Sequence, residues 1–212
     1  HGPEEVLLKP AAAKALLFAA SLLPLAWLLY GALANQLGAN PAEALIRATG
    51  DWTLRFLCLT LAVTPLRMLT GRAVLTRFRR LIGLIAFAYA TLHLAVYVLD
   101  RSLGEDGFTL RDVAKDIAKR PYITIGTLAF VILLALAVTS TNGMIRRLGK
   151  SWQTLHRLVY PAALLGVIHF AWLVKASLVK PLILFGVLVV LLAARLPSWL
   201  RQPASKTKRT AS

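Results

Sequence analysis

The chain has 212 residues, 58% of them hydrophobic, and a formal net charge of +16 from 25 Lys and Arg against 9 Asp and Glu. Soluble domains are typically about 45–50% apolar, so this composition excludes an ordinary soluble domain and, with it, a basic nucleic-acid-binding protein. It is typical of a polytopic membrane protein with basic loops, and the single cysteine, Cys58, excludes an internal disulfide and a cysteine-based zinc or iron–sulfur site.

Six apolar segments, taken in chain order, are long enough or nearly long enough to cross a hydrocarbon core of about 30 Å as helices. They comprise residues 15–34, 52–68, 81–99, 122–139, 158–174 and 181–196. The sequence therefore predicts an all-α integral membrane protein in which residues 15–198 form one domain of six transmembrane helices. Residues 1–14 and 199–212 are expected to be short tails, and we interpret His1, which stands in place of methionine, as a remnant of a cloning tag.

The loops between these segments differ in charge, which predicts the orientation, because loops rich in Lys and Arg stay in the cytoplasm. One side carries most of the basic residues, which are Lys9, Lys14, Arg67, Arg72, Arg77, Arg79, Arg80, Arg146, Arg147, Lys150, Arg195, Arg201, Lys206, Lys208 and Arg209. Both termini are therefore expected in the cytoplasm, with the basic loops against anionic lipid. The longest loop on the other side, residues 100–120, mixes acids and bases evenly, and Thr109 is expected to cap a surface helix over 110–119.

Ionisable residues inside a membrane span are costly and usually functional, and here they are histidines. His93 lies on the third segment and His169 on the fifth, and at 1.5 Å per residue both lie about 9–10 Å inside the outer ends of their spans. Two imidazoles at matched depth are suited to bind one iron from opposite faces of a porphyrin. We therefore expect His93 and His169 to be axial ligands of an outer haem, b-type because no CxxCH motif is present. The alternative is that each is a hydrogen-bonded packing residue.

His156, also on the fifth segment, is expected about 20 Å closer to the cytoplasmic side than His169. Arg79 and Arg80 occupy its level on the third segment, so a second bis-histidine haem lacks its partner. We interpret His156 as a ligand or contact of a second redox group, either a haem with another sixth ligand or a flavin; the alternative is an interfacial histidine bonded to a loop. The side chains expected to contact that group or its anionic substituents are Arg79, Arg80, Trp152 and Arg157.

These residues carry a resemblance to a known family. Residues 79–93, RRLIGLIAFAYATLH, resemble the third span of the ferric-reductase-like transmembrane family, and residues 151–160, SWQTLHRLVY, followed by His169, resemble its fifth span. Residues 50–55 and 64–67 are similar to the second span of one bacterial branch, the haem-binding membrane subunits of a periplasmic methionine sulfoxide reductase system. The resemblance covers about residues 49–196.

The resemblance implies a six-helix b-type cytochrome of the bacterial inner membrane, an electron-transfer subunit without catalytic residues of its own. Its electrons would come from the quinone pool or a cytosolic flavin reductase. They would go to a periplasmic molybdenum-containing reductase, MsrP, which repairs methionine sulfoxide in periplasmic proteins. The resemblance also implies FMN as a cofactor and haem histidines at His93, His156 and His169. Two alternatives stay open: a ferric or quinone reductase acting directly at the outer face, and a small proton-coupled transporter.

Overall fold

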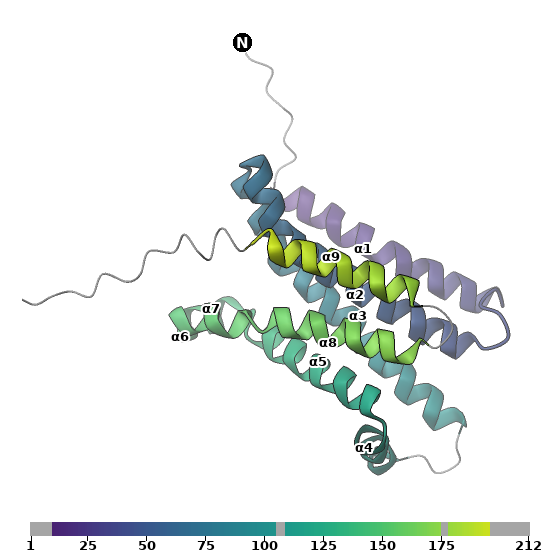
Figure 1. The fold of residues 1–212 in the computed structure, drawn as a ribbon. Coiled ribbons are helices and arrows are strands. Elements are labelled where there is room, and N and C mark those ends of the chain that lie inside the picture. The colour runs from purple at the N-terminus through teal and green to yellow at the C-terminus, as the bar shows by residue number, and fades with distance from the viewer. Residues whose placement is uncertain (1–9, 105–108, 175–177, 196–212) are drawn as a thin grey trace, which may run out of the picture.

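The computed structural model describes residues 10–104, 109–174 and 178–195, and in these ranges the chain is almost entirely helical (Figure 1). The elements in chain order are α1 (Pro10–Leu33), α2 (Pro41–Thr70), a 3₁₀ turn η1 (Ala73–Leu75), α3 (Thr76–Gly104), α4 (Leu110–Lys119), α5 (Pro121–Val138), α6 (Asn142–Leu148), α7 (Lys150–His156), α8 (Val159–Leu173) and α9 (Val179–Ala193). The six apolar segments coincide with α1, α2, α3, α5, α8 and α9, which confirms the all-α prediction.

Four of the described helices are long and apolar enough to cross a membrane: α1, α2, α3 together with η1, and α5. The helices α8 and α9 have 15 residues each. At 1.5 Å per residue this is a length of about 22 Å, which is shorter than a hydrocarbon core of about 30 Å. Six crossings therefore stay a prediction. Large apolar side chains on the outer helices are exposed, among them Trp27 at 71% and Val190 at 66%, as expected for faces that contact lipid.

Local sequence signals account for the ends of α2 and α4. Asn40 caps α2, because its side-chain oxygen accepts a hydrogen bond from the N–H of Glu43 at 3.1 Å. Gly71 ends that helix in the left-handed conformation, with a φ of 69°. The helix α4 spans the residues predicted for it, and the carboxylate of Asp112 accepts hydrogen bonds from both the backbone N–H and the hydroxyl of Thr109.

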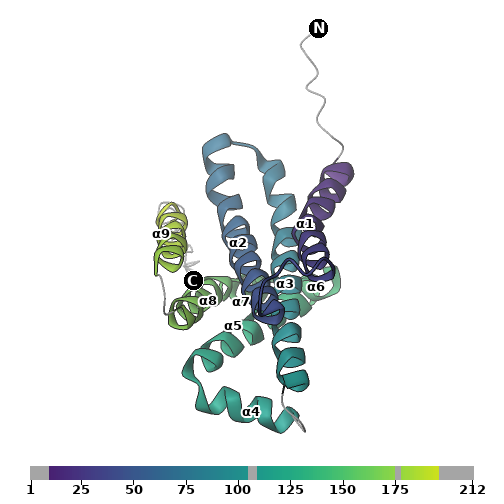
Figure 2. The same ribbon diagram turned by 90° about the vertical axis from the view of Figure 1, so that its right-hand side faces the viewer.

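The core is built from two helix pairs. The helix α2 packs along α3, and α5 packs along α8, while α1 and α9 lie outside these pairs (Figures 1 and 2). Small side chains let the helices approach closely, and Ala86 on α3 and Ala162 on α8 have no exposed surface. Leu57 and Leu61 of α2 fill the space between the pairs. This arrangement places both histidine-bearing helices around one core.

Pro65 lies inside α2, and the helix continues beyond it to Thr70. A proline has no N–H, so the carbonyl four residues earlier, that of Leu61, loses its helical donor. The guanidinium of Arg195 donates a hydrogen bond to this carbonyl oxygen and a second one, at 2.7 Å, to the hydroxyl of Tyr160. The sequence predicted Arg195 among the basic residues on the cytoplasmic side, which stays a prediction. Its side chain is buried, with 3% of its surface exposed, because it satisfies two acceptors inside the bundle.

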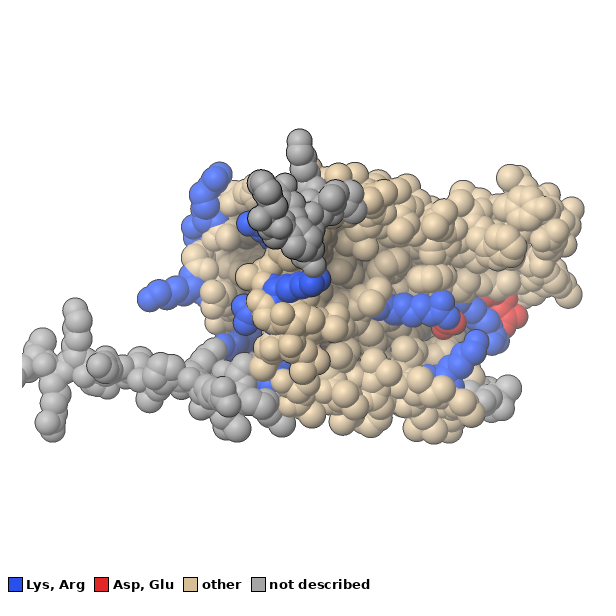
Figure 3. All heavy atoms as spheres, turned by 90° about the horizontal axis from the view of Figure 1, so that it is seen from above, with Lys and Arg blue, Asp and Glu red and all other residues tan. Residues whose placement is uncertain are grey.

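The two ends of the bundle differ in charge. Figure 3 shows Lys and Arg side chains gathered at the end where α6 and α7 lie in Figure 1, and a smaller group, mixed with acids, towards the other end. The exposed basic residues at the first end include Arg67, Arg72, Arg77, Arg146, Arg147 and Lys150. The fold thus brings the basic loops predicted for the cytoplasmic side to one end of the molecule.

Candidate functional site

The helices α3 and α8 bring the two outer histidines together. The ring centres of His93 and His169 are 6.1 Å apart, and their planes are nearly perpendicular, at 84°. Two imidazoles that bind one metal ion from opposite sides hold their ring centres about 6 Å apart, because each metal–nitrogen bond is about 2 Å and each ring centre lies ~1 Å behind its nitrogen. The two rings therefore have the spacing of a pair that shares one metal ion.

Backbone carbonyls fix the orientation of both rings. Nδ1 of His93 lies 2.8 Å from the carbonyl oxygen of Ile46 on α2, and Nδ1 of His169 lies 2.7 Å from that of Tyr122 on α5. A carbonyl can only accept, so each Nδ1 carries the ring proton and each Nε2 carries a lone pair. A hydrogen bond from the ring nitrogen that does not bind the metal is the usual support of a metal-binding histidine, because it sets both the tautomer and the ring orientation. The residues present thus fit the axial ligand pair of a b-type haem.

His156 has different surroundings. Its Nε2 lies 3.2 Å from the hydroxyl oxygen of Thr139 at the end of α5, and that hydroxyl donates its own proton to the carbonyl of Ala135 at 2.7 Å. The Thr139 oxygen therefore accepts from His156. The indole of Trp152 stacks on the imidazole with ring centres 4.0 Å apart, and its Nε1 donates to the Thr139 carbonyl at 2.9 Å. His156 and Trp152 are both tied to one residue of α5.

A cavity of about 270 Å³ with both apolar and polar lining lies beside His156, between α2, α3, α5 and α7. Its side chains include Arg79, Arg80, Thr60, Ser140, Trp152 and His156. Arg80 also donates a hydrogen bond to the side-chain oxygen of Asn142 on α6, at 2.5 Å. Three of the four residues predicted to contact the inner group therefore line one cavity with His156. Arg157, the fourth, is exposed and is not among the lining residues.

His156 and His169 do not lie on one continuous helix. The helix α7 ends at His156 and α8 begins at Val159. Pro161, in the first turn of α8, has no N–H to donate to a preceding turn, which accounts for the break. A straight helix therefore does not describe this segment, and the ring of His156 is held by its contacts with Thr139 and Trp152. The structure does not bring His156 to the outer pair.

Asp116 joins α4 to α3 and to Arg120, the residue between α4 and α5. Its carboxylate accepts a hydrogen bond from the Tyr97 hydroxyl at 2.8 Å and pairs with Arg101 and Arg120, each at 3.4 Å. Its side chain is only 14% exposed. The charge of Asp116 is therefore neutralised within the protein.

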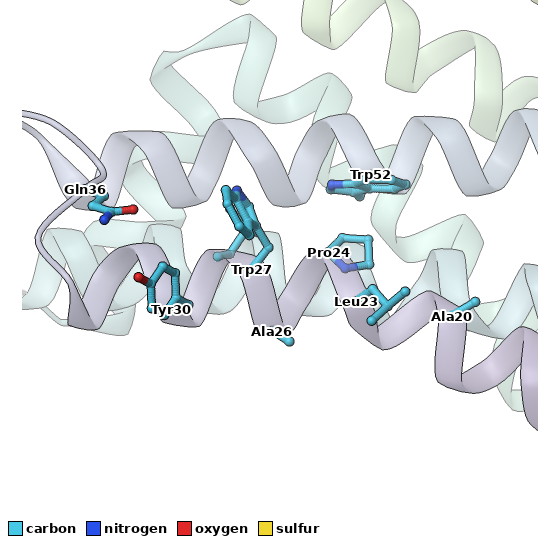
Figure 4. A pocket seen from close by; sticks show the side chains of 9 residues that line it. Ala20, Leu23, Pro24, Ala26, Trp27, Tyr30, Gln36 and Trp52 are labelled. Atoms are coloured by element: carbon cyan, nitrogen blue, oxygen red, sulfur yellow. The ribbon is translucent and has the colours of Figure 1, made fainter.

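An apolar groove of about 1060 Å³ separates α1 from α2. Figure 4 shows Trp27 and Pro24 of α1 pointing towards the side of α2 that carries Trp52. The Trp52 ring packs against that of Tyr89, with centres 6.5 Å apart, and the guanidinium of Arg55 lies 4.6 Å from the Trp52 ring centre. Tyr89 is one helical turn before His93 on α3. A side chain in the groove wall thus packs against the helix that carries an outer histidine.

Sequence reasoning missed the groups that orient the histidines. The acceptors are backbone carbonyls, at Ile46 and Tyr122, and a carbonyl carries no signature in the amino-acid sequence. The two pairs share one spacing, because each acceptor precedes its histidine by 47 residues.

Known proteins that resemble the chain support a family assignment. Residues 49–167 match the family described as "Ferric reductase like transmembrane component". The chain is 56% identical over 173 residues to the protein-methionine-sulfoxide reductase heme-binding subunit MsrQ of Polaromonas naphthalenivorans, covering 81% of this chain and 77% of that protein. It is 47% identical over 202 residues to the MsrQ of Xanthomonas oryzae pv. oryzae, covering 92% and 90% of the two chains. It is 51% identical over 192 residues to the MsrQ of Rhodospirillum rubrum, covering 89% of each.

Proposed function

The chain belongs to the ferric reductase-like transmembrane family and, within it, to the group of MsrQ heme-binding subunits; from this premise we propose that it is the haem-carrying membrane subunit of a protein-methionine-sulfoxide reductase. The observation that carries the proposal is the close pair of His93 and His169, with ring centres 6.1 Å apart. A bound haem supplies a one-electron carrier at this position. The chain itself contributes transport of electrons, and the reduction of methionine sulfoxide belongs to its partner.

His93 and His169 would hold a b-type haem. Both are neutral imidazoles with a lone pair on Nε2, because their Nδ1 protons point at the carbonyls of Ile46 and Tyr122. Two neutral ligands bring no extra charge into the apolar interior, where an unpaired charge is costly. The carbonyl bonds raise the basicity of the rings and so strengthen both as ligands.

The proposed orientation follows the charge difference between the two ends. The end with the exposed basic residues faces the cytoplasm, both termini lie on that side, and six helices within residues 15–198 cross the bacterial inner membrane. The shorter helices α8 and α9 complete the crossings. The outer pair then lies near the periplasmic end, where α4 covers the bundle, and the acceptor is a periplasmic molybdenum-containing reductase of the MsrP type.

The inner cavity is the proposed place of electron entry. Arg79 and Arg80 offer cations to a haem propionate or a flavin phosphate, and Trp152 and His156 offer aromatic surfaces to a flat ring. A second haem or FMN there would receive electrons from a cytosolic flavin reductase. The exposed side chain of Arg157 is available at the surface for the same anionic groups.

The quinone pool is the second proposed donor, and the groove between α1 and α2 supports this route. Its aromatic wall suits a flat, apolar ring that diffuses in the membrane. Trp52 in that wall packs against Tyr89, one turn from His93. Reduction by quinol and reduction by a flavin reductase are distinguishable, because only the first should fall when Trp52 is replaced by leucine.

The visible spectrum of the purified protein tests the central proposal. We expect a Soret band with sharp reduced α and β bands in the wild type. The low-spin six-coordinate spectrum should be lost in His93→Ala and in His169→Ala and retained in the matched variant His156→Ala. A wild-type protein without a haem spectrum after haem supplementation would overturn the proposal and favour the proton-coupled transporter. Unchanged spectra in both outer variants would overturn the ligand assignment.

A further inference from the structure

The two outer histidines are held by the same local arrangement on two helix pairs. In each pair the first helix offers a carbonyl, at Ile46 on α2 or Tyr122 on α5, and the second helix carries the histidine 47 residues later. A glycine follows one helical turn after each carbonyl residue: Gly50 on α2 and Gly126 on α5. Residues one turn apart share a helix face, so each glycine lies on the face that meets its imidazole.

The imidazoles pass so close to these glycines that there is almost no space for a side chain. A Cβ atom at Gly126 would lie 2.8 Å from Nδ1 and 2.9 Å from Cε1 of His169. A Cβ atom at Gly50 would lie 3.1 Å from Nδ1 and 3.2 Å from Cε1 of His93. Ordinary carbon contacts are about 3.5–4.0 Å. A methyl group at either position therefore presses on the ring atom that donates to the carbonyl.

We propose that Gly50 and Gly126 are positioning residues that set the ring orientation, the carbonyl hydrogen bond and hence the reduction potential of the metal bound by His93 and His169. This inference rests on the proposed function. The hydrogen bond from Nδ1 makes the imidazole a more basic ligand, and a more basic ligand stabilises the oxidised metal. Displacing the ring from the carbonyl weakens this bond, so the potential should rise.

A third glycine provides the matched control. A Cβ atom at Gly166 on α8 would lie 2.9 Å from Cδ2 of Leu54, an overlap similar to that at Gly126 but with an apolar side chain. Alanine at position 166 would therefore crowd a leucine and not a histidine. Gly186 on α9 is a second control, because nothing lies within 4 Å of a Cβ atom placed there. Alanine at these four positions separates crowding of a histidine from crowding in general.

The experiment measures three properties of the purified haem-loaded variants Gly50→Ala, Gly126→Ala, Gly166→Ala and Gly186→Ala. They are haem content per protein, the midpoint potential, and the EPR spectrum of the low-spin ferric form, whose anisotropy depends on the angle between the axial rings. We expect an upward shift of the potential and an altered EPR spectrum in the first two variants, larger for Gly126→Ala because its overlap is greater. Gly166→Ala should lower the thermal midpoint but leave both signals unchanged.

Each result decides the inference. Wild-type potential and EPR spectrum in both Gly50→Ala and Gly126→Ala would overturn it, and so would equal shifts in Gly166→Ala. Should Gly126→Ala fail to hold haem, Gly50→Ala decides, because His93 has to move by only a few tenths of an ångström there. Failure of the proposed function looks different: the wild type itself would then bind no haem through His93 and His169.

Discussion

Arg195 at the C-terminal end of α9 donates a hydrogen bond to the carbonyl oxygen of Leu61, which is the acceptor that Pro65 leaves without a helical N–H. Arg195 and Leu61 are 134 positions apart in the chain. The guanidinium replaces the missing donor and also bonds the Tyr160 hydroxyl at 2.7 Å. One buried side chain thereby joins α9 to the proline site of α2 and to α8.

Replacing Arg195 by methionine should lower the stability of the protein in detergent. The Leu61 carbonyl would be buried without a donor, at a cost of about 1–3 kcal/mol. The matched background is Pro65→Ala, in which the alanine N–H can bond Leu61 itself. A double-mutant cycle on thermal unfolding should therefore show a smaller loss for Arg195→Met in Pro65→Ala than in the wild type. Equal losses in the two backgrounds would show that the Leu61 bond contributes nothing.

Replacing His156 by alanine should slow reduction of the outer haem by the cytosolic donor while leaving its spectrum unchanged. The reason is that His156 lines the inner cavity with Arg79 and Arg80, away from the outer pair. Thr139→Val is the control, since it removes the hydroxyl bonded to His156 but keeps the imidazole. Normal reduction in Thr139→Val and slow reduction in His156→Ala would assign the effect to the ring. Equal effects in both variants would indicate that His156 acts only by tying its helix to Thr139.

Much of the fold could be predicted because its signals are local. Apolar runs located the six main helices, and Thr109 with Asp112 located α4 to the residue. The matched depths of His93 and His169 came from counting residues. The interactions that orient them involve backbone groups of Ile46 and Tyr122 on other helices, and these depend on how the helices pack. The burial of Arg195 also depends on how the helices pack, whereas its charge alone predicted a position on the aqueous side.

Asp112 should titrate at an unusually low pH. The Lys115 ammonium, followed by the hydroxyl and N–H of Thr109, holds the pKa of this carboxyl at about 2, below its ordinary value of about 3.9. A lowered pKa in the folded state means that the carboxylate supports α4 fully above pH ~4 and loses this role as the pH falls towards 2. The protection of the α4 amides against hydrogen exchange, relative to the intrinsic exchange rate at each pH, should therefore fall only in that range. In the variant Asp112→Asn the amides of α4 should exchange faster already at neutral pH. Unchanged protection in this variant would show that the Asp112 cap does not stabilise α4.

The acids of α4 are paired within the protein, whereas two of its bases are exposed. Asp116 pairs within the protein with Arg101 and Arg120, and Asp112 pairs with Lys115. Arg111 and Lys119 on α4 are exposed, and no ion pair of either is found among the described residues. A soluble acceptor would therefore meet two free positive charges on α4. We therefore expect the bases of α4, rather than its acids, to take part in docking an acceptor.

Electron transfer from the pre-reduced cytochrome to the periplasmic reductase should slow as salt rises, because exposed charges more than ~8–10 Å apart are screened at physiological ionic strength. Charge reversal in Arg111→Glu with Lys119→Glu should lower the bimolecular rate and its salt dependence while haem content stays unchanged, since rim charges act mainly on the association rate. The control is Arg146→Glu with Arg147→Glu, an equal change at the opposite end of the bundle, which should leave the rate unaltered. Stopped-flow oxidation of the reduced haem over a salt series measures the rate for the wild type and for both double variants. Rates that are independent of salt and of the α4 charges would place the docking surface elsewhere, whereas equal losses in both double variants would indicate a response to net charge alone.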